Sequence, residues 1–102
     1  MTSYRVADID EIKVGCLKRV EPNGVPICLA HLSEGGVYAV SDICSHEEIE
    51  LSGGDLQGKE IECPAHGSRF NVETGEVSGL PASEPVLVFE VTVKGQDVFV
   101  DL

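Results

Sequence analysis

Residues 44–66 read CSHEEIELSGGDLQGKEIECPAH, and the two ends of this stretch decide how the whole chain is interpreted. The stretch begins with Cys44 and His46 in the pattern C-x-H, and it ends with Cys63 and His66 in the pattern C-x-x-H. Thiolate and imidazole are common ligands of transition metals. The chain holds only 4 cysteines and 3 histidines, so two such close pairs predict one metal site rather than a chance arrangement.

Each pair contains one cysteine and one histidine, as a [2Fe–2S] cluster with mixed ligands requires. Two loops can then supply one ligand each to both irons, with Cys44 and Cys63 on one iron and His46 and His66 on the other. Structural zinc sites also use these residue types, but they usually keep like ligands together, as C-x₂₋₄-C and H-x₃₋₅-H. The mixed pairs favour the cluster, and zinc stays the alternative from the residues alone.

Composition narrows the class of protein. The 102 residues suffice for one domain, and with no Trp the core must consist mainly of Val, Leu and Ile, which favours strands. A net charge of −11 argues against nucleic acid and anionic membrane surfaces, and it suits docking on cationic partners. The chain shows neither a signal-peptide pattern nor a run of ~20 apolar residues. We therefore expect a cytoplasmic protein whose cysteines are ligands or thiols in a reducing compartment.

Apolar runs and turn signals predict an all-β framework on both sides of the metal-binding stretch. Asn23-Gly24 is a hairpin signal between two of the expected strands, whereas residues 8–12 fit either one helical turn or a loop. The alternation of apolar residues in the strand expected before the C-terminus slips at Phe89-Glu90. Strands are expected at 14–21, 25–32, 37–40, 85–94 and 98–102.

The middle of the chain differs from this framework. Residues 42–84 are rich in glycine and proline, hold both ligand pairs, and offer only two short strands, at 61–63 and 69–71, with a turn at 73–76. We therefore predict a single domain, 1–102. Its base comprises residues 1–41 and 85–102, and an inserted, loop-rich segment at about 42–84 binds the metal.

The remaining cysteines and histidine carry less information. Cys16 and Cys28 are predicted strand residues with buried thiols. They are not opposite one another in a hairpin that turns at Asn23-Gly24, so a disulfide between them is not expected. His31 has no potential metal ligand close in sequence, and we interpret it as structural.

The sequence resembles the Rieske family, and specifically the small Rieske ferredoxins of bacterial ring-hydroxylating dioxygenase systems. The resemblance covers essentially the whole chain and implies the Rieske fold, an antiparallel β sandwich or incomplete barrel with an inserted cluster-binding subdomain. It also implies one [2Fe–2S] cluster per chain, with the histidines nearer the surface and Leu80-Pro81 covering one side. It rests on Cys44-Ser-His46, on CPAHGSRF at 63–70, on Thr74-Gly-Glu76 and on GLPA at 79–82.

The same resemblance implies a role as a carrier rather than an enzyme. Such proteins receive single electrons from a flavin-containing, NAD(P)H-dependent reductase and pass them to a terminal oxygenase, and we expect this chain to do so as a monomer. The small subunit of assimilatory nitrite reductases carries the same signature and remains an alternative. The sequence does not indicate which substrate the oxygenase oxidises.

Two differences from the Rieske proteins of quinol-oxidising complexes are implied by the resemblance. Ile49 and Ala65 occupy the positions of two cysteines that form a disulfide there, and Phe70 replaces a tyrosine whose hydroxyl donates to a cysteine sulfur. Loss of such a donor lowers the reduction potential of the cluster. Acidic neighbours lower this potential too, whereas the hydroxyl of Ser68 could donate to the cluster and raise it. We predict a potential near the low end of the Rieske range, about −150 mV rather than +300 mV; the acidic neighbours are Glu47, Glu48 and Glu50.

Overall fold

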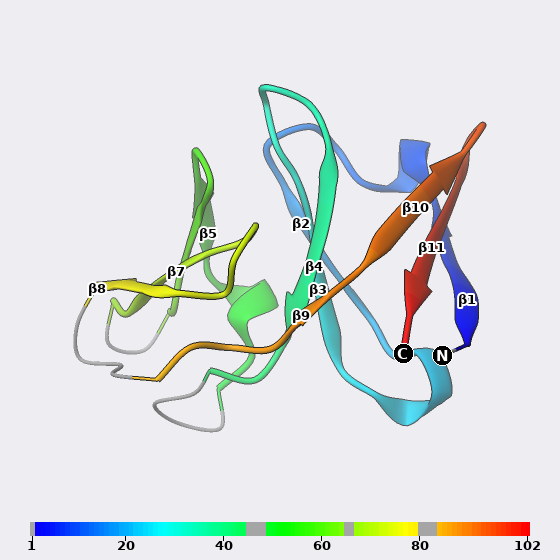
Figure 1. Ribbon diagram of the computed structural model, residues 1–102. Coiled ribbons are helices and arrows are strands. Elements are labelled where there is room, and N and C mark those ends of the chain that lie inside the picture. The colour runs from blue at the N-terminus through cyan, green and yellow to red at the C-terminus, as the bar shows by residue number, and fades with distance from the viewer. Residues whose placement is uncertain (1, 45–48, 65–66, 80–83) are drawn as a thin grey trace.

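The computed structural model describes residues 2–44, 49–64, 67–79 and 84–102, and within these ranges the chain is built almost entirely from antiparallel strands (Figure 1). The predicted all-β fold class is confirmed. No helix in the described ranges has the length and apolarity that crossing a membrane requires. The strands are β1 (Ser3–Asp8), β2 (Leu17–Val20), β3 (Ile27–His31), β4 (Val37–Ser41), β5 (Asp55–Gln57), β6 (Glu60–Glu62), β7 (Arg69–Asn71), β8 (Val77–Gly79), β9 (Val88–Phe89), β10 (Val91–Lys94) and β11 (Asp97–Asp101). The short 3₁₀ helices are η1 (Ile9–Glu11), η2 (Pro22–Gly24) and η3 (Leu51–Gly53).

These strands form three sheets. The first sheet has the strand order β1-β11-β10, the middle sheet β2-β3-β4-β9 and the third sheet β5-β6-β7-β8. The third sheet lies at the end of the molecule away from the two termini (Figure 1). The termini themselves are joined by backbone hydrogen bonds between Thr2 and Leu102, at 3.1 and 3.0 Å. The chain therefore leaves the terminal end of the molecule, builds the third sheet and returns.

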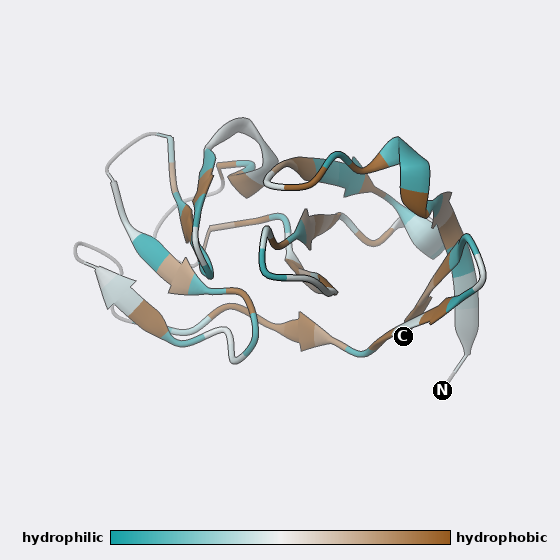
Figure 2. Ribbon diagram, turned by 90° about the horizontal axis from the view of Figure 1, so that it is seen from above, coloured by the Kyte–Doolittle hydropathy of each residue, from teal (hydrophilic) through white to brown (hydrophobic). Residues whose placement is uncertain are grey.

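The middle sheet is covered on both faces, because successive residues of β3 enter two different cores. Ile27 and Leu29 pack into the core shared with the first sheet, whereas Cys28 and Ala30 pack into the core shared with the third. A strand buried on both faces needs apolar residues at every position, which explains the uninterrupted run at the start of β3. Seen from above, hydrophobic stretches accordingly occur along the whole length of the molecule (Figure 2).

The hairpin expected at Asn23-Gly24 is present, with a longer connection than a two-residue turn. β2 pairs with β3 so that Arg19 lies opposite Cys28. The connecting residues include η2, in which Asn23 has a φ of 51°. His31, the histidine interpreted as structural, has its Nδ1 2.8 Å from the carbonyl oxygen of Ile12, and an N–H there donates to that oxygen.

The expectation for Cys16 is wrong, and that for Cys28 is confirmed. β2 begins at Leu17, because the amide of Cys16 donates to the carbonyl of Lys13 at 3.0 Å and closes a turn there. Cys16 is therefore exposed and outside the strand. Cys28 is buried, and burial, with a smaller contribution from Asp42, raises the pKa of its thiol. The two residues are thiols, with no disulfide between them.

The alternation slip near Phe89 marks a change of sheet. β9 pairs with β4 through Phe89 opposite Ala39, whereas β10 pairs with β11 in the first sheet. The single expected strand at 85–94 is thus two strands separated by Glu90. β1 was not predicted, because a bulge between Arg5 and Ala7 breaks the alternation of apolar and polar residues along it. β5 and β8 were not predicted, because they are too short to show such an alternation.

Candidate metal centre

Both predicted cysteine ligands lie in one apolar core between the middle and third sheets. Cys44 is 3% exposed and Cys63 is 2% exposed, and both pack within the group that contains Leu51, Ile61 and Phe70. A sulfur atom placed there is withdrawn from water. The predicted partners His46 and His66 lie outside the described residues, as do Ala65, the acids Glu47 and Glu48, and the covering loop expected at Leu80-Pro81.

The first cysteine opens a loop that is closed by its own backbone. Ile43 forms an isolated antiparallel bridge with Glu50, and the amide of Cys44 donates to the carbonyl of Ile49 at 2.9 Å. Ile49, at the position where the resemblance implies a missing cysteine, packs instead against the apolar core. This loop is therefore held by backbone bonds and packing, as the absence of that disulfide requires.

The second cysteine opens a similar loop between β6 and β7. The amide of Cys63 donates to the carbonyl of Ser68 at 2.7 Å, and the amide of Gly67 donates back to the carbonyl of Cys63 at 3.2 Å. Gly67 has a φ of 75°, a conformation that any other residue adopts only with strain. In both loops the cysteine amide thus bonds to the carbonyl five residues later, so each cysteine begins a loop that its own backbone closes.

The chain leaving the first loop packs directly against the second. Gly54 follows η3, and a Cβ on it would lie 1.9 Å from the carbonyl oxygen of Glu62, the residue before Cys63. A Cβ on Gly53 would lie 3.8 Å from Cγ of Pro64, the residue after Cys63. The two cysteine loops are therefore parts of one packed unit, and Gly54 is required because no side chain fits there.

This donor set suits an iron–sulfur cluster. Two cysteine sulfurs lie in a shared apolar core, and each is carried on a short loop with a tied backbone. Iron–sulfur clusters take thiolate ligands, and an apolar shell with backbone donors sets their properties. What the described residues present is therefore compatible with the proposed cluster, with each loop contributing one sulfur.

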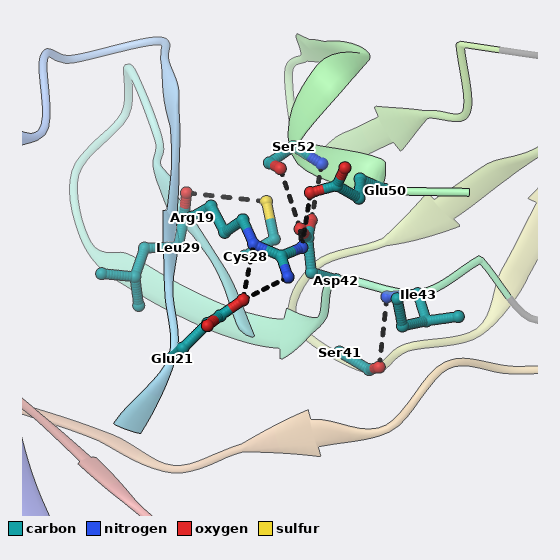
Figure 3. Close-up of polar contacts among 9 residues, drawn as sticks. All are labelled: Arg19, Glu21, Cys28, Leu29, Ser41, Asp42, Ile43, Glu50 and Ser52. Carbon is teal, nitrogen blue, oxygen red and sulfur yellow. Dashed lines mark hydrogen bonds and ion pairs between the residues drawn. The ribbon is translucent and has the colours of Figure 1, made fainter. Parts of the chain in front are cut away.

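A polar group at the base of the first loop was not predicted from the sequence. Asp42 has no exposed surface, and its carboxylate accepts from the guanidinium of Arg19 and from Ser52, whose amide and hydroxyl lie at 2.6 and 2.9 Å (Figure 3). Arg19 also bonds to Glu21 and pairs with Glu50 at 2.7 Å. The hydrogen bond to Glu21, and to a smaller extent the one to Asp42, raise the pKa of Arg19.

Sequence reasoning could not find this group, because Arg19 and Asp42 are far apart in the chain and neither belongs to a ligand motif. The available signal was an acidic residue directly after an apolar strand and two residues before the first cysteine. A carboxylate buried in such a position requires partners.

Comparison with known proteins gives a consistent assignment. The model of the Rieske [2Fe-2S] domain matches residues 2–94. The chain is 37% identical over 92 residues to the ferredoxin component of the naphthalene 1,2-dioxygenase system of Pseudomonas aeruginosa, covering 90% of this chain and 88% of the relative. It also resembles the ferredoxin solved in a complex of reduced oxygenase and oxidised ferredoxin in carbazole 1,9a-dioxygenase. That match has a TM-score of 0.90 and 36% identity, and it covers 96% of this chain and 100% of the other.

For the nitrite reductase alternative, the similarity described below is one of fold. A solved structure described as a small subunit of a nitrite reductase has a TM-score of 0.82 and covers 100% of both chains, but the identity is 21%. At that level the likeness concerns the arrangement of the strands.

Proposed function

This chain belongs to the Rieske [2Fe–2S] domain family, and on that premise we propose that it carries single electrons to the terminal oxygenase of an aromatic-ring-hydroxylating dioxygenase system. The observation that carries the proposal is the pair of tied loops with Cys44 and Cys63 in one apolar core, in a chain that matches ferredoxin components over nearly their full length. When bound, the [2Fe–2S] cluster accepts and releases one electron at a time.

The proposed ligands divide between the two irons by residue type. Cys44 and Cys63, both buried, would hold one iron, and His46 and His66 would hold the other, with one cluster per chain. The chain holds the two cysteine sulfurs away from water, and we propose that the electron leaves the cluster through the histidines. We propose residues 42–84 as the cluster-binding subdomain and residues 1–41 and 85–102 as its base.

The same proposal assigns the chain two partners. An NAD(P)H-dependent, flavin-containing reductase would supply the electrons, and the terminal oxygenase would receive them and perform the chemistry on the ring. The chain is then an electron-transfer component of a multicomponent system rather than an enzyme, acting in the cytoplasm as a monomer. Its net charge of −11 suits transient contact with cationic surfaces on both partners.

The test is electron transfer with defined partners. The reduced protein is mixed in a stopped-flow instrument with the terminal oxygenase of a naphthalene-type system, and in parallel with a sirohaem nitrite reductase. Rapid oxidation by the oxygenase alone is the expected result. Oxidation by the nitrite reductase alone, or stable association with its sirohaem subunit, would replace the proposal by the alternative.

Neutralising the acids beside the first histidine is expected to slow electron transfer. In the double variant Glu47→Gln/Glu48→Gln, two charges that attract a cationic partner are lost, so the rate falls at low ionic strength and the difference fades as salt rises. The matched control is Asp10→Asn/Glu90→Gln, which removes the same charge from exposed sites outside 42–84. Stopped-flow rates that fall equally for both variants would mean that only net charge matters.

Adding a hydroxyl at Phe70 is expected to raise the midpoint potential. Phe70 is fully buried in the core that holds both cysteines, and we expect a tyrosine hydroxyl there to donate to a cysteine sulfur. Such a bond favours the reduced cluster. Protein-film voltammetry of Phe70→Tyr measures the shift. The control is Phe99→Tyr, on β11 in the first sheet, which should leave the potential unchanged. An unchanged or lowered potential in Phe70→Tyr would contradict the donor argument.

A further inference from the structure

The two cysteine loops are supported in different ways. The second loop stands on the β6–β7 hairpin, where Glu62 pairs with Arg69 and Ile61 with Phe70 in a regular ladder. The first loop has no such ladder among the described residues. Ile43, the residue before Cys44, forms one isolated bridge with Glu50. A loop with so short a stem needs support from elsewhere if its cysteine is to stay in one place.

The support comes from Asp42, which binds the far side of the loop with both its backbone and its side chain. Its carbonyl accepts from the amide of Leu51 at 2.7 Å, and its carboxylate accepts from the amide of Ser52 at 2.6 Å. Its own amide donates to the carbonyl of Pro26 at 3.0 Å, which ties it to the segment before β3. One residue thus closes the stem and fixes it to the middle sheet.

Arg19 completes this arrangement from β2. Its guanidinium reaches Asp42 on one side of the stem and Glu50 on the other, and Figure 3 shows the arginine side chain lying between the carboxylates of Glu21, Asp42 and Glu50. Arg19 is 31% exposed at its side chain, whereas Asp42 is not exposed at all. The buried carboxylate therefore depends on this arginine for its compensating charge.

We propose that Arg19 and Asp42 are positioning residues that hold the first ligand loop, and through it Cys44, in the geometry that sets the redox properties of the cluster. This inference rests on the proposed function, since it assigns the two residues a role toward the proposed cluster. The pair acts where a disulfide is absent: its contacts join the stem of the loop to β2 and η3 without a covalent link.

The test uses the holoprotein with Arg19→Met, Asp42→Asn and Arg19→Lys. The matched control is Arg5→Met, which makes the same substitution in an exposed ion pair with Asp97 in the first sheet. Three properties are measured: the midpoint potential, the EPR line shape of the reduced protein, and the rate at which a ferrous chelator removes iron. If Asp42→Asn does not accumulate as folded protein, Arg19→Met and Ser52→Ala are judged by the same measurements.

The expected result is that Arg19→Met and Asp42→Asn lose iron about tenfold faster and show a shifted potential and broader EPR lines. Arg19→Lys keeps the charge and should stay close to the wild type, and Arg5→Met should be indistinguishable from it. A lower melting temperature with unchanged potential, line shape and iron release in Arg19→Met and Asp42→Asn would overturn the proposal and leave a purely structural ion pair. A wild-type protein without a Rieske EPR signal would instead overturn the proposed function itself.

Discussion

Cys63→Ala is expected to purify as a colourless protein without stoichiometric iron. The substitution removes one of two proposed thiolates from a core that excludes water, and the two cysteines outside the proposed ligand set, Cys16 and Cys28, lie outside both ligand loops and cannot replace it. A cluster held by only one of its two proposed thiolates would lack a protein ligand on that iron and would be lost. Iron and sulfide analysis, together with the visible spectrum, measures the effect directly.

Two other cysteines provide the controls for this variant. Cys16→Ala changes an exposed thiol, and Cys28→Ala changes a buried thiol on β3, in the same core as Cys63. Both should keep the colour and full iron content, although Cys28→Ala should lose some stability because it leaves a small cavity. Full iron content and an unchanged spectrum in Cys63→Ala would remove this residue from the ligand set.

The same variant should also be less stable than the loaded protein. A group that binds the folded state alone stabilises it by mass action, so its loss returns the chain to the stability of the apoprotein. Thermal unfolding of Cys63→Ala should therefore fall to that of wild-type protein stripped of iron, with a small further loss from the cavity that the missing sulfur leaves in the core. A variant that unfolds at the temperature of the loaded wild type would contradict this expectation.

Gly54→Ala is expected to be the most damaging substitution at a position with no ligand role. Its Cβ would lie 1.9 Å from the carbonyl oxygen of Glu62, so either η3 or β6 must move. A forced backbone shift of this kind in a packed region costs on the order of 3 kcal/mol. Because Glu62 precedes Cys63, the shift should also displace the second ligand loop and speed the release of iron.

Gly53→Ala is the matched control, because it adds the same methyl group one residue earlier. The nearest atom to its Cβ, Cγ of Pro64, lies at 3.8 Å, which is an ordinary contact. Alanine in place of glycine within a short helix changes stability by no more than about 1 kcal/mol. Urea denaturation of the two variants compares them, and equal midpoints would contradict the close packing of the two loops.

The sequence was most informative where chemistry or local turns decide the structure. The turn after Asn71 is one example: the side chain of Asn71 accepts from the amides of Glu73 and Thr74, and the expected turn at 73–76 forms there. β3 and β4 were also predicted, because strands covered on both faces are continuous apolar runs.

The features that the sequence did not reveal depend on contacts between distant residues. The split between β9 and β10 follows from pairing with different sheets, which a slip in alternation hints at without explaining. The pairing of Arg19 with Asp42 and the approach of Gly54 to Glu62 exist only after the sheets have assembled. Local patterns carry no information on such contacts, so the ligand motifs could be predicted but their support could not.

The most direct test of the account is the EPR spectrum of the dithionite-reduced protein, recorded after the visible spectrum of the oxidised form. A red-brown protein that bleaches on reduction and gives a rhombic signal with a low average g is the predicted result, since unequal ligands on the two irons produce it. A colourless protein that contains one zinc ion and gives no signal after reconstitution with iron and sulfide would contradict the central claim.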